Sequence, residues 1–169
     1  MSWQVRLAER AEVPRLPDVE RAAARLFPAG RIPEPDETHS VEELLEYLSR
    51  GLLWVAADEH EPLGYVYAGE LDGALHVYEL AVDPAHGRRG LGTALMRRAM
   101  AEAPARRLDR VTLTTFEDLP WNAPFYERLG FRTLAPNELS ASLATILEHE
   151  RAVGMIRRVA MRYSVPVRT

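Results

Sequence analysis

The chain has 169 residues, of which 47% are hydrophobic and 27% charged, as expected for one globular domain with a hydrophobic core. It contains no cysteine and no lysine, which excludes disulfides, a thiol nucleophile and a lysine Schiff base. The net charge of −4 argues against a nucleic-acid partner. The sequence shows neither a membrane-spanning run nor a signal-peptide pattern, so we expect a cytoplasmic protein with no membrane partner.

The first half of the sequence predicts two helices and four strands. Apolar residues recur at helical spacing between Glu12 and Phe27, and Ser40 followed by Glu43 forms a capping-box pattern before a second helix. The tripeptide Leu71-Asp72-Gly73 is typical of a tight hairpin turn. The expected helices are 12–27 and 41–50, and the expected strands are 3–7, 52–58, 63–70 and 74–82.

The second half of the sequence predicts alternating helices and strands. Helical spacing covers 93–103, β-branched residues fill 110–116, and Gly130 ends a short helix over 124–129. A strand over 131–134, a helix over 140–153 and a strand over 157–164 complete the pattern. Antiparallel strands followed by a strand–helix–strand unit predict a mixed α/β sheet, and no repeat divides the chain.

A glycine-rich turn follows the strand that ends at Val82. Its sequence is Gly87-Arg88-Arg89-Gly90-Leu91-Gly92-Thr93, and it leads into a predicted helix. Free N–H groups at a helix start bind phosphate where glycines allow close approach, and the two arginines would add charged donors. Taken alone, the turn could equally be a glycine-assisted connection with two solvated arginines. It lacks the lysine of a nucleoside-triphosphatase loop and the spacing of a dinucleotide-binding fingerprint.

Two segments of the chain resemble the GNAT N-acetyltransferase family. Val82-Asp83-Pro84 with the following 89–95 segment is similar to its acetyl-CoA signature, and the segment 122–131 is similar to its second motif, in the family's order and separation. The resemblance implies a single N-acetyltransferase domain over 1–169. It also implies a mixed, mostly antiparallel sheet of about six or seven strands, flanked by helices and splayed at the central strands. The chain departs from the pattern at Gly87, where Gln or Arg is usual, and at Asn122, which lies closer to Phe125 than in many members.

The same resemblance implies an activity and a pair of catalytic residues. Acetyl-CoA would be the co-substrate, and its acetyl group would pass to an amine of a small molecule or peptide by direct attack through a tetrahedral intermediate. Glu79 is the candidate general base, because burial in an apolar strand would raise its pKa; a salt-bridged carboxylate without a catalytic role is the alternative. Tyr126 is the candidate general acid for the departing thiolate, and an aromatic ring packed under the sheet is the alternative.

The cofactor contacts implied by the resemblance come from one strand, the glycine turn and the second motif. The strand would bond the pantetheine through its backbone, and one of its N–H groups could stabilise the oxyanion. Asn122 would cap its helix, bond the pantetheine, or do both. The implied cofactor-binding residues are Leu80, Ala81, Val82, Gly87, Arg88, Arg89, Gly90, Leu91, Gly92, Thr93, Asn122 and Phe125.

The remaining aromatic and histidine residues carry weaker signals. Trp54 is expected in the core, whereas Trp121 could wall the acceptor cleft or lie in the core. His76 and His86 have no partner at metal-ligand spacing, so we expect no metal site.

The distribution of acidic residues bears on which substrate the protein would bind. A run of acids between residues 34 and 43 favours a cationic acceptor, although such residues can also form a solvated surface. These acids are Glu34, Asp36, Glu37, Glu42 and Glu43. The C-terminal helix and strand offer a face for a homodimer. Two other functions stay open, a non-catalytic CoA-binding regulatory or scaffold domain and a nucleic-acid binder that uses the arginine cluster.

Overall fold

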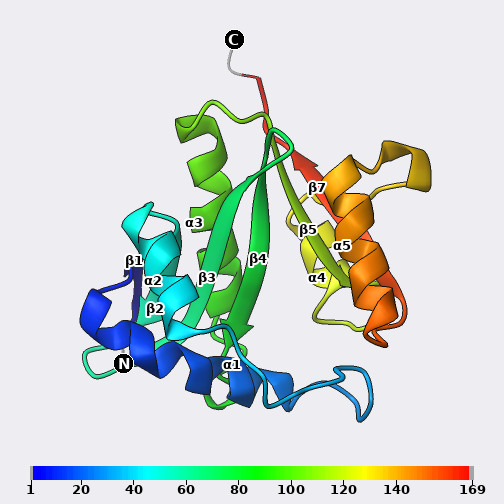
Figure 1. Cartoon of the computed structure of the whole chain (residues 1–169). Coiled ribbons are helices and arrows are strands. Elements are labelled where there is room, and N and C mark those ends of the chain that lie inside the picture. Colours follow the sequence, from blue (N-terminus) through cyan, green and yellow to red (C-terminus); the bar gives the residue numbers. More distant parts are fainter. Residues whose placement is uncertain (1, 168–169) are drawn as a thin grey trace. The chain divides into compact units, whose positions relative to one another are not determined.

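The computed structural model describes residues 2–167 and contains a seven-stranded sheet with the order β1-β2-β3-β4-β5-β7-β6 (Figure 1). The predicted α/β class and mostly antiparallel sheet are confirmed. Contacts within the chain group its residues into two compact units. Unit 1 runs to Gly69 and resumes over Val77–Ala101, and unit 2 combines Glu70–His76 with the chain from Glu102 onward. Splaying of the central strands stays a prediction, as does the single domain.

Unit 1 is built from antiparallel strands and the helices that cover them. Register pairs Gln4 with Ala57 between β1 and β2, and Leu53 with Tyr67 between β2 and β3. Strands β3 and β4 also contribute residues to unit 2. The elements are β1 (Gln4–Leu7), the 3₁₀ helix η1 (Arg10–Arg15), α1 (Leu16–Ala24), α2 (Val41–Ser49), β2 (Leu53–Ala57), β3 (Pro62–Leu71), β4 (Ala74–Val82), the 3₁₀ helix η2 (Pro84–His86) and α3 (Leu91–Ala105).

The two faces of the sheet in unit 1 follow from the alternation of side chains along β2. Leu53 and Val55 belong to a core cluster that also contains residues of η1, α1 and α2, such as Leu16 and Leu44. Trp54 points to the opposite face, where the guanidinium of Arg98 in α3 lies 5.1 Å from the centre of its ring. Trp54 is fully buried, which confirms its predicted core position. Helices therefore cover both faces of this part of the sheet.

Unit 2 centres on β7 (Arg158–Ser164), which lies antiparallel between β5 (Arg110–Phe116) and β6 (Arg132–Thr133). The first residues of β4 pair in parallel with β5, with Leu75 opposite Val111. The other elements are α4 (Ala123–Arg128), the 3₁₀ helix η3 (Pro136–Glu138) and α5 (Ala141–Ala152). A small core cluster joins Leu134, Leu143 of α5 and Ala160 of β7.

Local signals in the sequence fix several boundaries as predicted. The hydroxyl of Ser40 accepts a hydrogen bond from the N–H of Glu43 at 3.1 Å and caps α2. Asp72 and Gly73 have φ values of 50° and 75°, the two left-handed residues that a type I′ hairpin turn requires. Hairpin β3–β4 therefore turns where the sequence indicates.

Two predicted elements differ from the structure. The expected helix 12–27 is divided into η1 and α1, because Pro14 and Pro17 supply no N–H to an α-helical ladder in the first turns. Within the expected strand 131–134, β6 itself spans only Arg132 and Thr133, and the N–H of Leu134 adds one hydrogen bond to the carbonyl of Ala160. The exposed side chains of β6 suit a short edge strand. No helix within residues 2–167 combines the length and apolarity needed to cross a membrane.

Candidate functional site

The glycine turn joins β4 to α3 through two left-handed residues. The carboxylate of Asp83 accepts a hydrogen bond from the N–H of Ala85 at 3.0 Å and starts η2. Arg88 and Gly90 then have φ values of 61° and 81°, and α3 begins at Leu91. A Cβ on Gly90 would meet no atom within 4 Å, so the space over this backbone is open and glycine is favoured by conformation.

The turn presents donors suited to an anion. The first N–H groups of α3 have no acceptor within the helix, and the helix dipole adds partial positive charge at the same end. Arg88 and Arg89 are both exposed here, and Nη1 of Arg89 lies 3.4 Å from Nδ1 of His86. Gly87, by contrast, has extended backbone angles. A Cβ there would lie 3.3 Å from the carbonyl oxygen of Pro84, so tight packing favours glycine at this position.

Asn122 stands at the N-terminus of α4 in unit 2, but its side chain makes no capping hydrogen bond. Of the two roles expected for Asn122, the side-chain cap is therefore wrong, and a contact with the pantetheine stays a prediction. Pro124 at the second helical position has no N–H to offer a cap, and Nδ2 of Asn122 instead donates to the carbonyl of Trp121 at 3.3 Å. Oδ1 of Asn122 is buried without a hydrogen-bond partner. A buried acceptor of this kind is costly unless a ligand donor meets it.

Tyr126 lies on α4 and is 8% exposed. Its ring makes edge contacts with Phe125 at 5.0 Å and Phe131 at 5.8 Å between centroids. Trp121, just before this helix, is 40% exposed. A core position for Trp121 is therefore wrong, and its role as a cleft wall stays a prediction.

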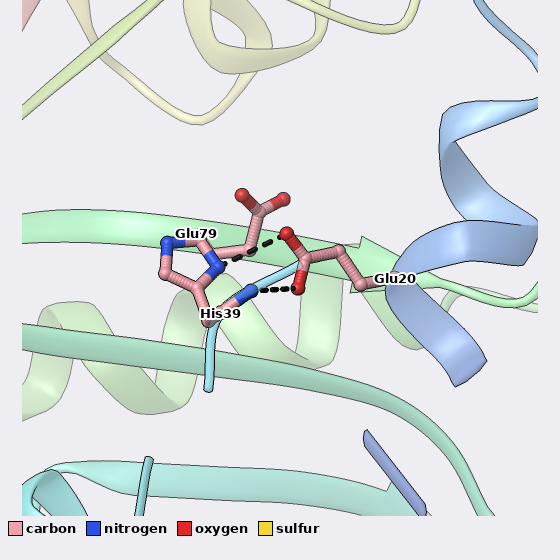
Figure 2. Close-up of side chains that lie close together, drawn as sticks. All are labelled: Glu20, His39 and Glu79. Atoms are coloured by element: carbon pink, nitrogen blue, oxygen red, sulfur yellow. Dashed lines mark hydrogen bonds and ion pairs between the residues drawn. The ribbon is translucent and has the colours of Figure 1, made fainter. Parts of the chain in front are cut away.

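Glu79 belongs to a cluster of three side chains in unit 1 (Figure 2). Glu20 comes from α1, His39 from the loop before α2 and Glu79 from β4, and one nitrogen or oxygen atom of each lies within 4.8 Å of the others. Nδ1 of His39 lies 3.0 Å from Oε1 of Glu20. The other oxygen of Glu20 accepts hydrogen bonds from the N–H of His39 and from the hydroxyl of Tyr65, each at 3.0 Å.

The cluster creates a strongly negative local potential. Burial alone would lower the pKa of His39, but the hydrogen bond to Glu20 and the charges of Glu79, Glu20 and Glu43 raise it above its ordinary value. Burial would raise the pKa of Glu20, yet the hydrogen bonds and charge of His39, with the Tyr65 hydroxyl, hold it below its ordinary value. Burial and the charges of Glu79 and Glu20 raise the pKa of Tyr65 well above its ordinary value. Contact with Glu20 therefore favours the protonated form of His39, paired with the ionised carboxylate.

Three tyrosines flank this cluster. The rings of Tyr67 and Tyr78 stack at 5.5 Å, Tyr47 tilts against both, and His39 sets its edge on Tyr67 at 5.1 Å. The hydroxyl of Tyr67 donates to Glu43 at 3.3 Å. The aromatic packing holds His39 from one side while Glu20 holds it from another.

A model of the acetyltransferase (GNAT) family matches residues 16–131, more than half of the chain. The chain belongs to the GNAT acetyltransferase family. The matched region contains the glycine turn, Glu79, Asn122 and Tyr126, so the resemblance seen in the sequence is confirmed.

Solved structures share the fold of this GNAT acetyltransferase. The PaiA N-acetyltransferase of Thermoplasma acidophilum, in complex with coenzyme A, is 16% identical, with a TM-score of 0.71 over 97% of this chain and 99% of that one. The protein yncA of Salmonella typhimurium, with acetyl-CoA, is 17% identical, with a TM-score of 0.71 over 100% of this chain and 97% of that one. The ribosomal-protein-S18-alanine N-acetyltransferase of Escherichia coli is 16% identical, with a TM-score of 0.70 over 99% of this chain and 97% of that one.

The structure distributes the expected site residues of this GNAT chain between its units. Glu79, the 80–82 strand segment and the glycine turn lie in unit 1, whereas Asn122, Phe125 and Tyr126 lie in unit 2. Within unit 1 the strand segment and the turn are continuous in the chain. Ala81 is buried, and its carbonyl oxygen would lie 2.9 Å from a Cβ added to Gly64 on β3.

Sequence reasoning missed Glu20 and His39. Neither belongs to a recognisable motif, and the Pro-rich segment between them carries no periodic pattern. His76 and His86, the histidines considered for a metal, lie elsewhere. The donor types of Glu20, His39 and Glu79 would also suit a divalent cation. However, Nδ1 of His39 is already within hydrogen-bond distance of Glu20, so a shared proton accounts for their spacing.

Proposed function

We propose that this chain transfers the acetyl group of acetyl-CoA to an amine of a small molecule or peptide. The observation that carries the proposal is the glycine turn at the start of α3, which lies inside the family match and opens backbone donors to an anion. Support comes from two structures of the same fold that hold coenzyme A or acetyl-CoA. The pyrophosphate would lie on the turn, with the exposed guanidiniums of Arg88 and Arg89 beside it.

The rest of the cofactor would be held by β4 and α4. The backbone of Leu80–Val82 would exchange hydrogen bonds with the pantetheine amides. Oδ1 of Asn122, which is buried without a partner, would accept from a pantetheine N–H, and the half-buried ring of Phe125 would pack on the same arm.

Glu79 and Tyr126 would carry the proton transfers. Glu79 would accept a proton from the amine, whose free lone pair then attacks the thioester carbonyl and forms a tetrahedral oxyanion. A backbone N–H of β4 would stabilise that oxyanion. Collapse of the intermediate breaks the carbon–sulfur bond. The Tyr126 hydroxyl would donate its proton to the departing thiolate and would regain one from the positively charged nitrogen, giving the neutral amide, free coenzyme A and a protonated Glu79.

The acceptor would be a cationic amine. Glu20, Glu43 and Glu79 face His39 as its carboxylate neighbours, and the segment before α2 adds the exposed acids Glu34, Asp36 and Glu37. This concentration of negative charge would attract an ammonium group over a neutral one. Small polyfunctional amines and basic peptides are therefore the acceptors to try first.

Release of free coenzyme A thiol from acetyl-CoA, measured against a panel of amines, tests the activity. We expect Glu79→Gln to lower kcat by about 100-fold or more and Tyr126→Phe by about 10-fold or more. Tyr163→Phe, which removes a hydroxyl from another tyrosine of unit 2, serves as the matched control with near wild-type turnover. Absence of thiol release above background with every amine would remove the catalytic proposal.

A non-catalytic CoA-binding domain is the second candidate, favoured by one observation. Gly87 stands where the family usually places Gln or Arg, so one side-chain donor to the phosphates is missing. Calorimetry with coenzyme A separates the two: binding without turnover identifies the binding domain, and no binding removes both functions.

A further inference from the structure

The carboxylates of Glu20 and Glu79 lie close enough to repel each other when both are ionised. Their oxygens lie within 4.8 Å of each other, in a region where the side chain of Glu20 is only 14% exposed. Keeping two carboxylates this close both ionised costs free energy, because the repulsion between like charges favours one proton shared by the pair. A base that holds a shared proton cannot accept another from an amine, so some cation has to offset the repulsion.

His39 is placed to be that cation. Its Nδ1 lies 3.0 Å from Glu20, its backbone N–H donates to the same carboxylate at 3.0 Å, and Tyr67 packs on its ring. These contacts come from two different elements and hold the ring beside Glu20. The ring therefore lies near both carboxylates, where a proton on it would offset their charges.

We infer that His39, clamped by Glu20, is a positioning residue for Glu79: its imidazolium keeps the Glu79 carboxylate ionised and ready to accept the proton of the amine. The inference rests on the proposed function. The groups that face His39 are Glu20 of α1, Glu43 of α2, Tyr67 of β3 and Glu79 of β4. Tyr65 of β3 donates a hydrogen bond to Glu20. All of the charged groups among them are acids, so they favour the protonated ring.

The pH dependence of kcat/KM tests the inference, with acetyl-CoA saturating and one amine acceptor throughout. The ratio of variant to wild type cancels the ionisation of the amine itself. His39→Gln removes the cation but leaves both carboxylates. We expect its acidic limb to move up by about 1 pH unit or more, giving a loss of about 10-fold at pH 6 that closes to within about twofold at pH 9.

A double variant makes the test specific. Glu20→Gln with His39→Gln removes the cation and also the second carboxylate, so Glu79 no longer has a like charge beside it. We expect the acidic limb to return towards that of the wild type, a recovery of about fivefold at pH 6 over His39→Gln alone. His60→Gln, an exposed histidine of unit 1, is the matched control and should leave the profile unchanged.

Several outcomes would overturn the inference. An equal loss at every pH in His39→Gln would assign His39 a purely structural role, and a double variant that is as impaired as the single would do the same. A profile that changes on treatment with a chelator would assign the cluster to a divalent cation instead. If the wild type acetylates no amine, the proposed function falls and this inference with it. If the wild type is active and impaired by Glu79→Gln while His39→Gln keeps a parallel profile, only this inference falls.

A readout independent of turnover completes the test. The titration of the His39 ring, followed by NMR, should shift to lower pH in Glu79→Gln, because one of the carboxylates beside it becomes a neutral amide. An unchanged titration would show that the two groups do not interact and would overturn the inference even in an active enzyme. Calorimetry should give the same coenzyme A affinity for His39→Gln and wild type, which separates this cluster from the cofactor site.

Discussion

His39 and His76 are both largely removed from solvent, yet their surroundings drive their charge in opposite directions. Carboxylates surround His39 and raise its pKa above its ordinary value against the effect of burial. His76, 2% exposed on β4, meets the Thr112 hydroxyl at 2.9 Å, and burial lowers its pKa to about 4. Its acidic neighbours Glu150 and Asp72 raise that pKa only in part. Burial by itself therefore sets no charge state; what decides it is whether a carboxylate lies within hydrogen-bond distance.

The two histidines also give opposite contributions to stability as pH changes. His39 has a raised pKa, so its contribution is complete below its ordinary value of 6.5 and is lost as pH rises through the raised value. His76 has a lowered pKa, so its contribution is complete above 6.5 and is lost as pH falls towards about 4. The first histidine suits a charged site and the second a neutral core.

The largest expected effect concerns His76. Between pH 6.5 and 4 the unfolded chain binds a proton at His76, whereas the folded chain keeps the ring neutral because its pKa is lowered to about 4. This difference lowers the free energy of unfolding by about 3 kcal/mol over that range. In His76→Asn this part of the acid destabilisation disappears, although the variant is less stable at neutral pH. Urea unfolding at a series of pH values measures it, with the exposed His149→Asn as control. An unchanged pH slope in His76→Asn would show that His76 titrates normally in the folded protein.

The next effect would make His39 behave more like His76. Glu20→Gln removes the carboxylate that contacts His39 but leaves its half-buried ring in place, so we expect the pKa of His39 to fall. Single-histidine replacements assign the imidazole signals, and an NMR titration measures the shift. Glu42→Gln, an exposed acid on α2, should leave His39 unchanged. A shift of equal size in both variants would mean that overall charge, and not the contact with Glu20, controls the ring.

The smallest effect tests the outer support of the same cluster. Tyr65→Phe removes one hydrogen bond to Glu20, and this bond has the smallest influence among those that lower the pKa of that carboxyl. We expect the Glu20 pKa to rise by less than it rises in His39→Gln, and the free energy of unfolding to fall by about 1 kcal/mol. Carboxyl NMR and urea unfolding measure the two quantities. A rise as large as that in His39→Gln would give Tyr65, and not His39, the main influence on the Glu20 pKa.

Local chemistry explains which parts of the structure could be predicted. The cap at Ser40 and the turn at Asp72-Gly73 depend only on residues a few positions away. The start of α2 and the turn between β3 and β4 could therefore be predicted correctly. The glycine turn and the second motif were also recognisable as short segments. By contrast, the failed cap at Asn122 depends on the missing N–H of Pro124 and on the backbone angles at the start of α4, which a residue preference alone does not contain.

The charged cluster could not have been predicted in the same way. Glu79 was identified because an acid in an apolar strand is unusual. Glu20 lies on an ordinary helix and His39 in an irregular loop, and only the packing of α1 and the 25–40 segment on β3 and β4 brings them to Glu79. Contacts between elements far apart in the chain follow no period or spacing, so a sequence pattern cannot predict them.

Trp54 and Trp121 differ in their exposure to solvent, and this difference affects their fluorescence. Trp54 is fully buried beneath Arg98, whereas Trp121 is 40% exposed and directly precedes Asn122. Each unit therefore carries an indole in a different solvent environment, one emitting from an apolar interior and the other from contact with water. In a Trp3→Phe background, with Trp121→Phe and Trp54→Phe to separate the two signals, fluorescence can report events beside α4 and the intactness of the unit 1 core in the same sample.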